Sequence, residues 1–432
     1  MKGLSLVLFL GIGLFFVPGV QAQQPAEDTF ELQERIKRLE RRIKRLEQGQ
    51  SAPQTTEPIT KPDAVQDSQP VAKPFPRAPR ATGSSADSAF ATATGLSRTF
   101  NPAISVNGLF LGTYRSIEND NPNADVKTGM DIQEMELQFT ANVDTYLRAN
   151  FRVSFENDEV EIEESFVDLL LLNRLALRAG QFYTHLGKHN LLHTHQFPFI
   201  DAPLVNKEIF GDEAFLEIGA GLSYLMPLPW YSEWIFEFVE GRNDLLFNGP
   251  LNDDFVYLAH SRNLWDLNED TTVEIGGSFA IGRNGAGGNL GSDNRTTRIA
   301  GANLTLKWKP ARRARYKTLV WQSEYIGAWQ ETGVDPLTTV DNPDTNRGGM
   351  YSFIQYQFAE QWWVQARYGY FGFHQLETAN DKQRTSVLLG FVPSEFSAVR
   401  LQYNYIDEDW SNEHQVFLQL NFSMGSHPAH TY

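Results

Sequence analysis

Residues 131–144 read "DIQEMELQFTANVD", and this stretch decides the fold class of the chain. Apolar residues stand at every second position from Met135 to Val143, and charged or polar residues such as Glu134 and Glu136 fill the positions between them. Side chains on a β-strand alternate between two faces, so the stretch predicts a strand with one apolar and one charged face. Soluble β-sandwiches rarely place glutamates at strand centres, whereas membrane barrels with a wet lumen do.

The same alternation recurs along most of the chain. It returns in "YLRANFRVSFEND" at residues 146–158 and in "HQVFLQLNFSMG" at residues 414–425. About sixteen such strands are predicted between residues 101 and 432, joined for the most part alternately by short turns and long loops. Their centres lie near residues 108, 138, 150, 165, 179, 219, 236, 258, 276, 303, 322, 354, 367, 388, 402 and 419. The pattern predicts an all-β fold, a transmembrane antiparallel β-barrel of about fourteen to eighteen strands with its short turns in the periplasm.

One segment interrupts the alternation. In "EVEIEESFVDLLLL", residues 159–172, Glu161 and Glu163 share their parity with Leu169 and Leu171. An extra residue in one strand of a pair shifts this parity. The segment therefore predicts a β-bulge or an extension of the strand beyond the bilayer.

The first hundred residues do not follow the strand pattern. Residues 1–22 carry a lysine, an apolar run and a small-residue end, which predicts a cleaved signal peptide. Residues 23–47 carry isoleucine and leucine at heptad spacing, which predicts a short coiled-coil helix, with a solitary amphipathic helix as the alternative. Residues 48–100 are rich in Pro, Ser, Thr, Ala and Gln and predict a disordered linker. The barrel domain is then residues 101–432.

Composition and motifs exclude several functions. The chain has 432 residues, a formal net charge of −16 and no cysteine, which excludes disulfide-stapled folds and thiol chemistry. The acidic excess belongs to residues 101–432 and argues against a nucleic acid partner. The sequence contains no GxSxG or HExxH motif, and its glycine-rich stretch at residues 282–291 links two predicted strands. We therefore predict neither an enzyme nor a resident cofactor.

Charged residues at lumen parity are the candidates for pore lining. Acids outnumber bases among them, and rings of carboxylates lower the barrier for cations. The predicted pore-lining residues are Glu134, Glu136, Arg148, Arg152, Glu156, Glu217, Glu237, Glu324, Arg367 and Arg400. The alternative is that these opposed charges mainly hold the barrel wall rigid.

Four of the nine histidines gather in one predicted loop. His185, His189, His193 and His195 lie in residues 184–212, the third and longest of the long loops. Imidazoles and carboxylates are suitable ligands for Zn²⁺, Cu²⁺ or Ni²⁺. The nearby carboxylates of the loop belong to Asp201, Glu208 and Asp212. Three alternatives stay open: a transient metal site formed by the four histidines, a structural network of loop against wall, and a pH-sensitive gate.

Several stretches resemble a bacterial outer-membrane family often labelled zinc-regulated or TonB-dependent outer-membrane receptor, which is porin-like in size. They are "NPAISVNGLF", "VDTYLRANFRVSF", "EIEESFVD", "LALRAGQFYTHLG", "HTHQFPFIDAPLV", "LGFVPSEFSAVRLQYNY" and "SMGSHPAHTY". The resemblance covers residues 101–432 and implies a diffusion channel or a receptor-like barrel, with a zinc connection carried by the label. TonB-dependent transporters carry a large folded plug, whereas residues 23–100 provide only a short helix and a linker.

The resemblance also implies roles for particular segments. In general porins the third loop folds into the lumen and sets the constriction, which implies the same position for residues 184–212. Tyr432 matches the terminal aromatic residue that the barrel-assembly machinery reads. The helix and linker resemble N-terminal extensions of some trimeric outer-membrane porins, which implies a homotrimer.

The expected function is passive or facilitated diffusion of small hydrophilic solutes, with a preference for cations or metal complexes. The alternatives are a TonB-dependent-receptor-like, metal-linked outer-membrane receptor and an envelope-tethering protein without open-channel activity. We expect the barrel in the outer membrane of a Gram-negative bacterium, in contact with its lipid, and the N-terminal helix in the periplasm. The basic residues of that helix predict a contact with peptidoglycan.

Overall fold

The computed structural model describes a barrel within the compact unit Thr82–Tyr432. The described residues are 102–117, 128–156, 159–172, 174–212, 214–247, 249, 254–285, 295–310, 317–332, 344–374, 381–408 and 411–425. The predicted signal peptide, coiled-coil helix, linker and terminal Tyr432 lie outside them. In the part of the chain that is described, no helix is both long and apolar enough to cross a membrane.

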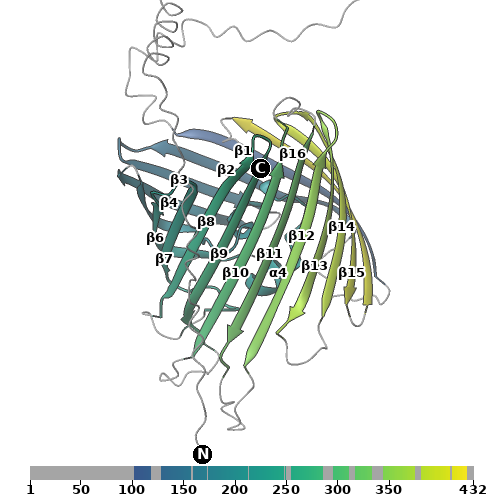
Figure 1. Cartoon of the computed structure of the whole chain (residues 1–432). Helices are drawn as coiled ribbons and strands as arrows, with labels where there is room; N and C mark the ends of the chain where they lie inside the picture. The colour runs from purple at the N-terminus through teal and green to yellow at the C-terminus, as the bar shows by residue number, and fades with distance from the viewer. Residues whose placement is uncertain are drawn as a thin grey trace, which may run out of the picture. The chain divides into compact units, whose positions relative to one another are not determined.

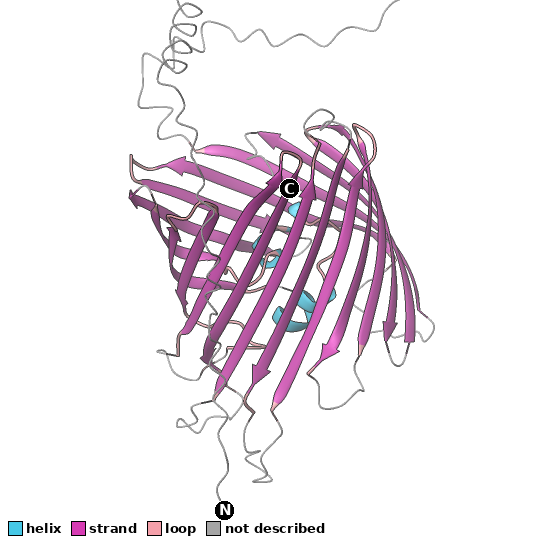
Figure 2. Ribbon diagram, viewed as in Figure 1, coloured by secondary structure: helices cyan, strands magenta, loops and turns pink. Residues whose placement is uncertain are grey.

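Sixteen antiparallel strands form the barrel wall within the described residues. Figures 1 and 2 show how they wrap around the lumen. They are β1 (Ala103–Ile117), β2 (Gly129–Asn142), β3 (Leu147–Phe155), β4 (Val160–Leu172), β5 (Leu175–Tyr183), β6 (Leu216–Leu225), β7 (Tyr231–Val239), β8 (Val256–Asn268), β9 (Thr271–Arg283), β10 (Thr296–Trp308), β11 (Thr318–Gln330), β12 (Thr345–Gln357), β13 (Trp362–Phe373), β14 (Lys382–Ser394), β15 (Ser397–Glu408) and β16 (Ser411–Gly425). Each strand pairs with its neighbours in sequence, and β1 pairs with β16 to close the sheet. Every predicted strand centre falls in a separate strand, so the predicted fold class and strand number are confirmed.

The alternation in the sequence corresponds to two chemically different surfaces. On β13, Trp362 and Tyr368 point outward and are 39% and 42% exposed, whereas Gln365 and Arg367 point into the lumen and are 2% and 3% exposed. An outward apolar face and an inward polar face are the arrangement that a lipid-embedded barrel with a wet interior requires.

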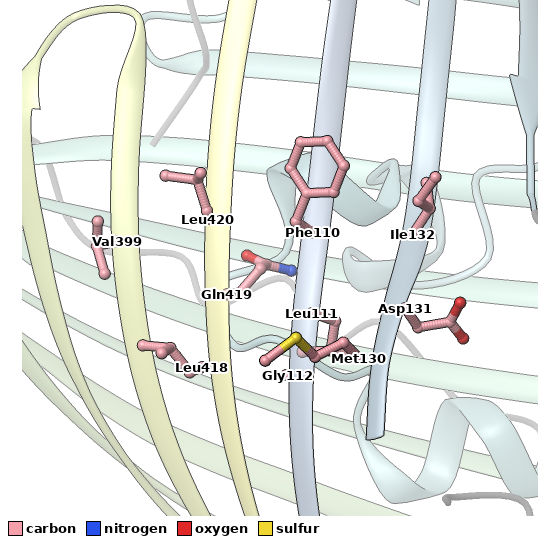
Figure 3. A pocket seen from close by; sticks show the side chains of 10 residues that line it. All are labelled: Phe110, Leu111, Gly112, Met130, Asp131, Ile132, Val399, Leu418, Gln419 and Leu420. Carbon is pink, nitrogen blue, oxygen red and sulfur yellow. The ribbon is translucent and has the colours of Figure 1, made fainter. Parts of the chain in front are cut away.

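The outer face is hollowed where the sheet closes. An apolar groove of about 510 Å³ lies over β16, β1 and β2. Figure 3 shows Phe110 on β1, Ile132 on β2 and Leu420 on β16 along this groove, while Gln419 belongs to the opposite face. Because the outward side chains are apolar across the closure, the seam keeps the same external chemistry as the rest of the wall.

Two bulges lie close together in the wall. In β4 the pairing shifts from Arg152–Glu164 to Val153–Ile162, which leaves Glu163 as the extra residue. The predicted bulge in this segment is therefore confirmed. Its consequence is that Glu163 and Glu164 are both buried on the lumen side, at 8% and 6% exposure. A second shift, between Leu109 and Phe110 of β1, leaves one extra residue, Gln133, in β2.

The interior of the barrel holds an apolar core. Several lumen-facing residues on the long-loop halves of β7 to β11 are apolar, and they pack against residues 184–212 and against Leu246 and Phe247. On β7 to β11, the wall residues of this core are Val239, Val256, Leu258, Ala280, Ile299, Ile326 and Ala328, and other strands add Phe166, Phe182, Tyr351, Phe353, Phe371, Leu388 and Phe417. Burial of this kind resembles the core of a soluble domain and fixes the long loop to the wall.

Candidate functional site: the inward-folded loop

The first part of the loop is attached to the wall by backbone donors and wall carboxylates. The Glu324 carboxylate on β11 accepts hydrogen bonds from the backbone nitrogens of Lys188 and His189, at 2.9 and 3.2 Å. The backbone nitrogen of Gly187 donates to the Ser278 hydroxyl on β9 at 2.9 Å. Gly187 has a φ of +81°, and a Cβ there would lie 1.9 Å from Glu324 Oε1, so only glycine allows this close approach.

The middle of the loop crosses to the opposite wall. Arg400 Nη1 on β15 donates to the carbonyl oxygen of Phe197 at 2.6 Å. The backbone nitrogen of Ile200 donates to Gln402 Oε1 at 2.7 Å, and Gln133 on β2 donates to the Ile200 carbonyl at 3.1 Å. The loop therefore contacts β9 and β11 on one side of the barrel and β2 and β15 on the other.

Asp201 is the most heavily bonded side chain of the loop. Its two carboxylate oxygens accept hydrogen bonds from Arg367 at 2.6 Å and from Arg384 at 2.7 Å. Gln402 and Asn404 donate to the same carboxylate at 2.6 and 3.1 Å. Burial alone raises the pKa of Asp201, but Arg367 and Arg384 outweigh it and hold the pKa at about 2. The ionised Asp201 carboxylate therefore joins the loop to β13, β14 and β15.

The loop ends in a short helix, α4 (Leu204–Phe210), that packs on β11, β12 and β13. Leu204, Val205 and Ile209 are buried in the apolar core. Glu208 on the opposite side of α4 accepts a hydrogen bond from Lys382 of β14 at 2.8 Å. Together these contacts confirm that residues 184–212 fold into the lumen, as the predicted position of the third loop implied; Figure 2 shows the helical turns of this segment inside the barrel.

The predicted pore-lining residues divide into two groups. Eight of the ten are buried on the lumen side: Glu134, Glu136, Arg152, Glu217, Glu237, Glu324, Arg367 and Arg400. Arg148 and Glu156, at the two ends of β3, are exposed. Several of the buried residues bond directly to the loop backbone or to its side chains. These charges therefore hold the loop in place, in addition to any effect that they have on a permeating ion.

The four histidines of the loop occupy different environments. His185 pairs with Glu237 of β7 and lies beside His260, with ring centroids 6.1 Å apart. His189 begins the single-turn helix η1 (His189–Leu191) and packs on Phe197, with centroids 4.4 Å apart. Burial, with Arg367 nearby, lowers the pKa of His189 to about 3, so its ring is neutral at ordinary pH. Among the described residues, the two groups of side chains that could hold a metal ion contain His193 and His195 but neither His185 nor His189, so a site formed by all four histidines stays a prediction.

His193 and His195 lie next to each other, on either side of the first residue of the short helix η2 (Thr194–Gln196). Their rings are stacked with centroids 6.0 Å apart. His193 Nδ1 is 2.9 Å from Glu163 Oε2, and its Nε2 is 3.1 Å from Glu164 Oε2. His193 is the N-cap residue of η2 and His195 is its second residue, so both rings meet the wall at the start of this helix.

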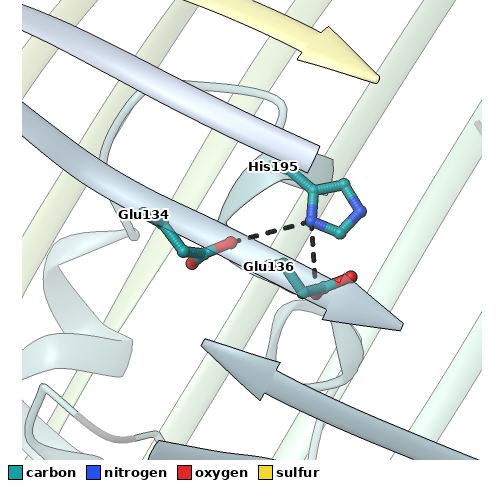
Figure 4. Close-up of side chains that lie close together, drawn as sticks. All are labelled: Glu134, Glu136 and His195. Atoms are coloured by element: carbon teal, nitrogen blue, oxygen red, sulfur yellow. Dashed lines mark ion pairs between the residues drawn. The ribbon is translucent and has the colours of Figure 1, made fainter. Parts of the chain in front are cut away.

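Glutamates of β2 complete this cluster. Glu136 Oε2 is 3.4 Å from Nδ1 of both His193 and His195. Glu134 Oε1 is 3.8 Å from His195 Nδ1. Figure 4 shows both carboxylates of β2 facing the His195 ring. We call Glu134, Glu136, Glu163, Glu164, His193 and His195 the His–Glu cluster.

Sequence reasoning missed Glu164, Lys188 and Arg384. Glu164 was assigned no role because the bulge in β4 reverses the parity of the strand at that point. Lys188, which bonds Glu274 at 2.8 Å, lies in the loop and has no periodic signal. Arg384 stands at lumen parity on β14, but its bond to Asp201 depends on where the loop lies. A charged residue in a loop beside histidines is the only signal in the sequence that points to Lys188.

A cavity of about 500 Å³ lies between the loop and the wall at the short-turn side. Its wall comes mainly from the short-turn halves of β7 to β12, and Leu191, Leu192 and Pro198 cover it from the loop. The charged and histidine side chains that line it are His185, Lys188, Glu233, His260, Arg262, Glu274 and Lys307. Lys188 and Arg262 both pair with Glu274, at 2.8 and 2.7 Å, so a polar surface with both signs of charge faces this part of the lumen.

Comparisons with known proteins agree with the fold. No protein-family model matches the chain. An uncharacterized protein from Aquifex aeolicus is 26% identical over 339 residues, which cover 71% of each chain. Among solved structures, Pseudomonas putida OprB in its high-pH structure has a TM-score of 0.54 and 9% identity, over 78% of this chain and 97% of its own. An anion-selective porin from Comamonas acidovorans has a TM-score of 0.51 and 12% identity, over 75% of this chain and all of its own (100%). These likenesses show the porin-type barrel fold.

Proposed function

We propose that the protein is an outer-membrane channel for diffusion of small hydrophilic solutes. One observation carries this proposal: the closed barrel holds an inward-folded loop that narrows the lumen, and polar side chains still line the space that is left. A barrel that served only as an anchor would not need Lys188, Arg262 and Glu274 around a cavity of about 500 Å³. Charged side chains that face water inside a barrel are the usual lining of a solute path.

The proposed path prefers cations. Around His193 and His195 lie the carboxyl groups of Glu134, Glu136, Glu163 and Glu164, and Arg152 bonds Glu164 at 3.0 Å. An excess of carboxylates at a constriction attracts cations and repels anions. We therefore expect the reversal potential in a salt gradient to have the sign of a cation-selective pore.

Cysteine accessibility tests the channel directly, because the native chain has no cysteine. Thr305→Cys places a thiol on the wall of the cavity, and Val387→Cys places one on the outer face, where the native valine is 47% exposed. In planar bilayers, a charged thiol reagent should reduce the conductance of Thr305→Cys and leave Val387→Cys and the native protein unchanged. Absence of conductance steps in the native protein would contradict the channel and favour a receptor or a tethering protein.

The assembly and location of the protein are further proposals. We propose a homotrimer in the outer membrane of a Gram-negative bacterium, with the barrel in lipid and residues 23–47 in the periplasm. The apolar outer face supports the membrane location, and the heptad spacing of residues 23–47 supports self-association. Contact of that helix with peptidoglycan and recognition of Tyr432 by the assembly machinery remain predictions. Native mass spectrometry of the full chain and of a chain lacking residues 23–47 tests the trimer.

A further inference from the structure

We propose that the His–Glu cluster is a binding site for a divalent transition-metal ion. Two overlapping groups of three residues could each hold an ion, because within each group the ligand atoms lie within 4.8 Å of one another. Glu134, Glu136 and His195 form the first group, and Glu136, Glu163 and His193 form the second. Glu136 belongs to both groups. The donors come from the loop, from β2 and from the bulge of β4, so they meet only because the loop folds inward.

The distances fit a common ion. Zinc lies about 2.0 to 2.2 Å from nitrogen and oxygen ligands, so neighbouring ligand atoms of a tetrahedral site are about 3.4 Å apart. Glu136 Oε2 is 3.4 Å from Nδ1 of His193 and 3.4 Å from Nδ1 of His195. Glu163 Oε2 and Glu134 Oε1 lie at 2.9 and 3.8 Å from the nearer ring nitrogen. These distances lie on both sides of the ligand spacing expected in a zinc site, so small shifts of the side chains would bring the ligand atoms to that spacing.

Two buried carboxylate oxygens supply an independent observation. Glu134 Oε1 and Glu136 Oε2 accept no hydrogen bond from any described residue, although the two side chains are only 2% and 1% exposed. Burial of a carboxylate oxygen without a donor costs several kcal/mol. Each of these oxygens lies within ion-pair distance of His195 Nδ1. A bound cation between them would replace the missing donors.

The donor set indicates the class of metal. Imidazole nitrogens together with carboxylates suit Zn²⁺, Fe²⁺, Co²⁺ and Ni²⁺, whereas Ca²⁺ and Mg²⁺ prefer oxygen ligands alone. His193 is also held by Glu164 at 3.1 Å from Nε2, and this outer contact orients the ring with Nδ1 toward Glu136 and Glu163. The metal would join the loop to β2 and β4, where the apolar core does not reach.

The full-length protein is refolded in detergent with Zn²⁺ and then dialysed. The zinc that stays bound is measured by inductively coupled plasma mass spectrometry. Native protein should retain at least one equivalent per chain. Glu136→Gln, which removes a ligand common to both groups, should lose it, and His195→Gln should weaken binding at least tenfold. The matched control is His260→Gln, because this buried lumen histidine bonds Ser278 and lies outside both groups.

Folding of each variant is checked by heat-dependent migration on gels, and Glu163→Gln replaces Glu136→Gln if the latter does not fold. Bound Co²⁺ provides a second readout, since its visible spectrum reports the number and type of ligands. The proposal is overturned if the native protein retains no zinc, or if Glu136→Gln retains as much as His260→Gln. Metal binding is measured without a bilayer, so its outcome is separate from that of the channel experiments.

Discussion

Asp201→Asn should release the middle of the loop from the wall. The substitution keeps the size of the side chain but removes the charge that faces Arg367 and Arg384, at 2.6 and 2.7 Å. Both arginines are largely buried, at 3% and 9% exposure, so each would be left without its carboxylate in a site that water reaches poorly. Removal of one partner from a buried ion pair typically costs about 3 to 5 kcal/mol.

The lower end of that range sets the expected size of the effect, because asparagine still accepts a hydrogen bond. A cost of about 3 kcal/mol corresponds to about two powers of ten in the equilibrium between the docked and the released loop. Hydrogen exchange of the Ile200 amide, which donates to Gln402 at 2.7 Å, should therefore be about a hundredfold faster in the variant. Single-channel conductance should rise, because the released loop leaves part of the lumen.

The contribution of Asp201 to the docking of the loop should also depend on pH. Arg367 and Arg384 lower the pKa of Asp201 from 3.8 to about 2 against the effect of burial, which corresponds to about 2 kcal/mol of stabilisation. Since the pKa is lowered on folding, this contribution is complete above a pH of about 4 and is lost as the pH falls through about 2. The conductance difference between native protein and Asp201→Asn should therefore be constant at neutral pH and vanish near pH 2.

The matched control is Glu240→Gln, which breaks an exposed pair with Arg242 of similar length, 2.9 Å. Exposed pairs contribute about 0 to 1 kcal/mol, so this variant should match the native protein in both assays. Equal hydrogen exchange at Ile200 in Asp201→Asn and native protein would refute the role of Asp201. So would a change of the same size in Glu240→Gln.

Three further variants test other parts of the site. Gly187→Ala brings a Cβ to 1.9 Å from Glu324 Oε1 and should speed hydrogen exchange of the loop amides by at least tenfold; an unchanged rate would show that the wall adjusts freely. Phe215→Ala opens a cavity in the apolar core and should lower the free energy of unfolding by about 3 to 5 kcal/mol in a urea titration, with the lipid-facing Phe236→Ala, 48% exposed in the native protein, losing less. Lys188→Gln removes a cation from the cavity and should shift the reversal potential toward stronger cation selectivity, which a shift of the opposite sign would contradict.

The barrel could be predicted from the sequence because its signal is periodic. An error of one residue in a strand would have exchanged its lumen-facing and lipid-facing side chains. Every predicted strand centre nevertheless lies in a separate strand. The bulge in β4 was also predicted from parity, through Glu161 and Glu163. Its result was not predictable, since the sequence does not show that Glu163 and Glu164 would both turn toward a loop from elsewhere in the chain.

The apolar core inside the barrel was the least predictable feature. Leu258 and Ile299 face the lumen, where the alternation of the other strands leads one to expect polar residues. In β8 and β10 both faces carry apolar residues on the long-loop half, so periodicity alone does not assign the inner face. The covering residues lie in the loop, and only the folded chain brings Leu204 or Phe210 against them.

The position of the loop changes what the lumen charges mean. Glu324 was predicted to line a pore, but its oxygens accept hydrogen bonds from Lys188 and His189 and from the Tyr351 hydroxyl. A carboxylate that is saturated with donors in this way contributes less to the field felt by a passing ion than one that faces water. A count of acids and bases on the wall therefore overstates the selectivity of the lumen. Charged residues that line the cavity, such as Glu233 and Lys307, act on a passing ion more directly than Glu324 does.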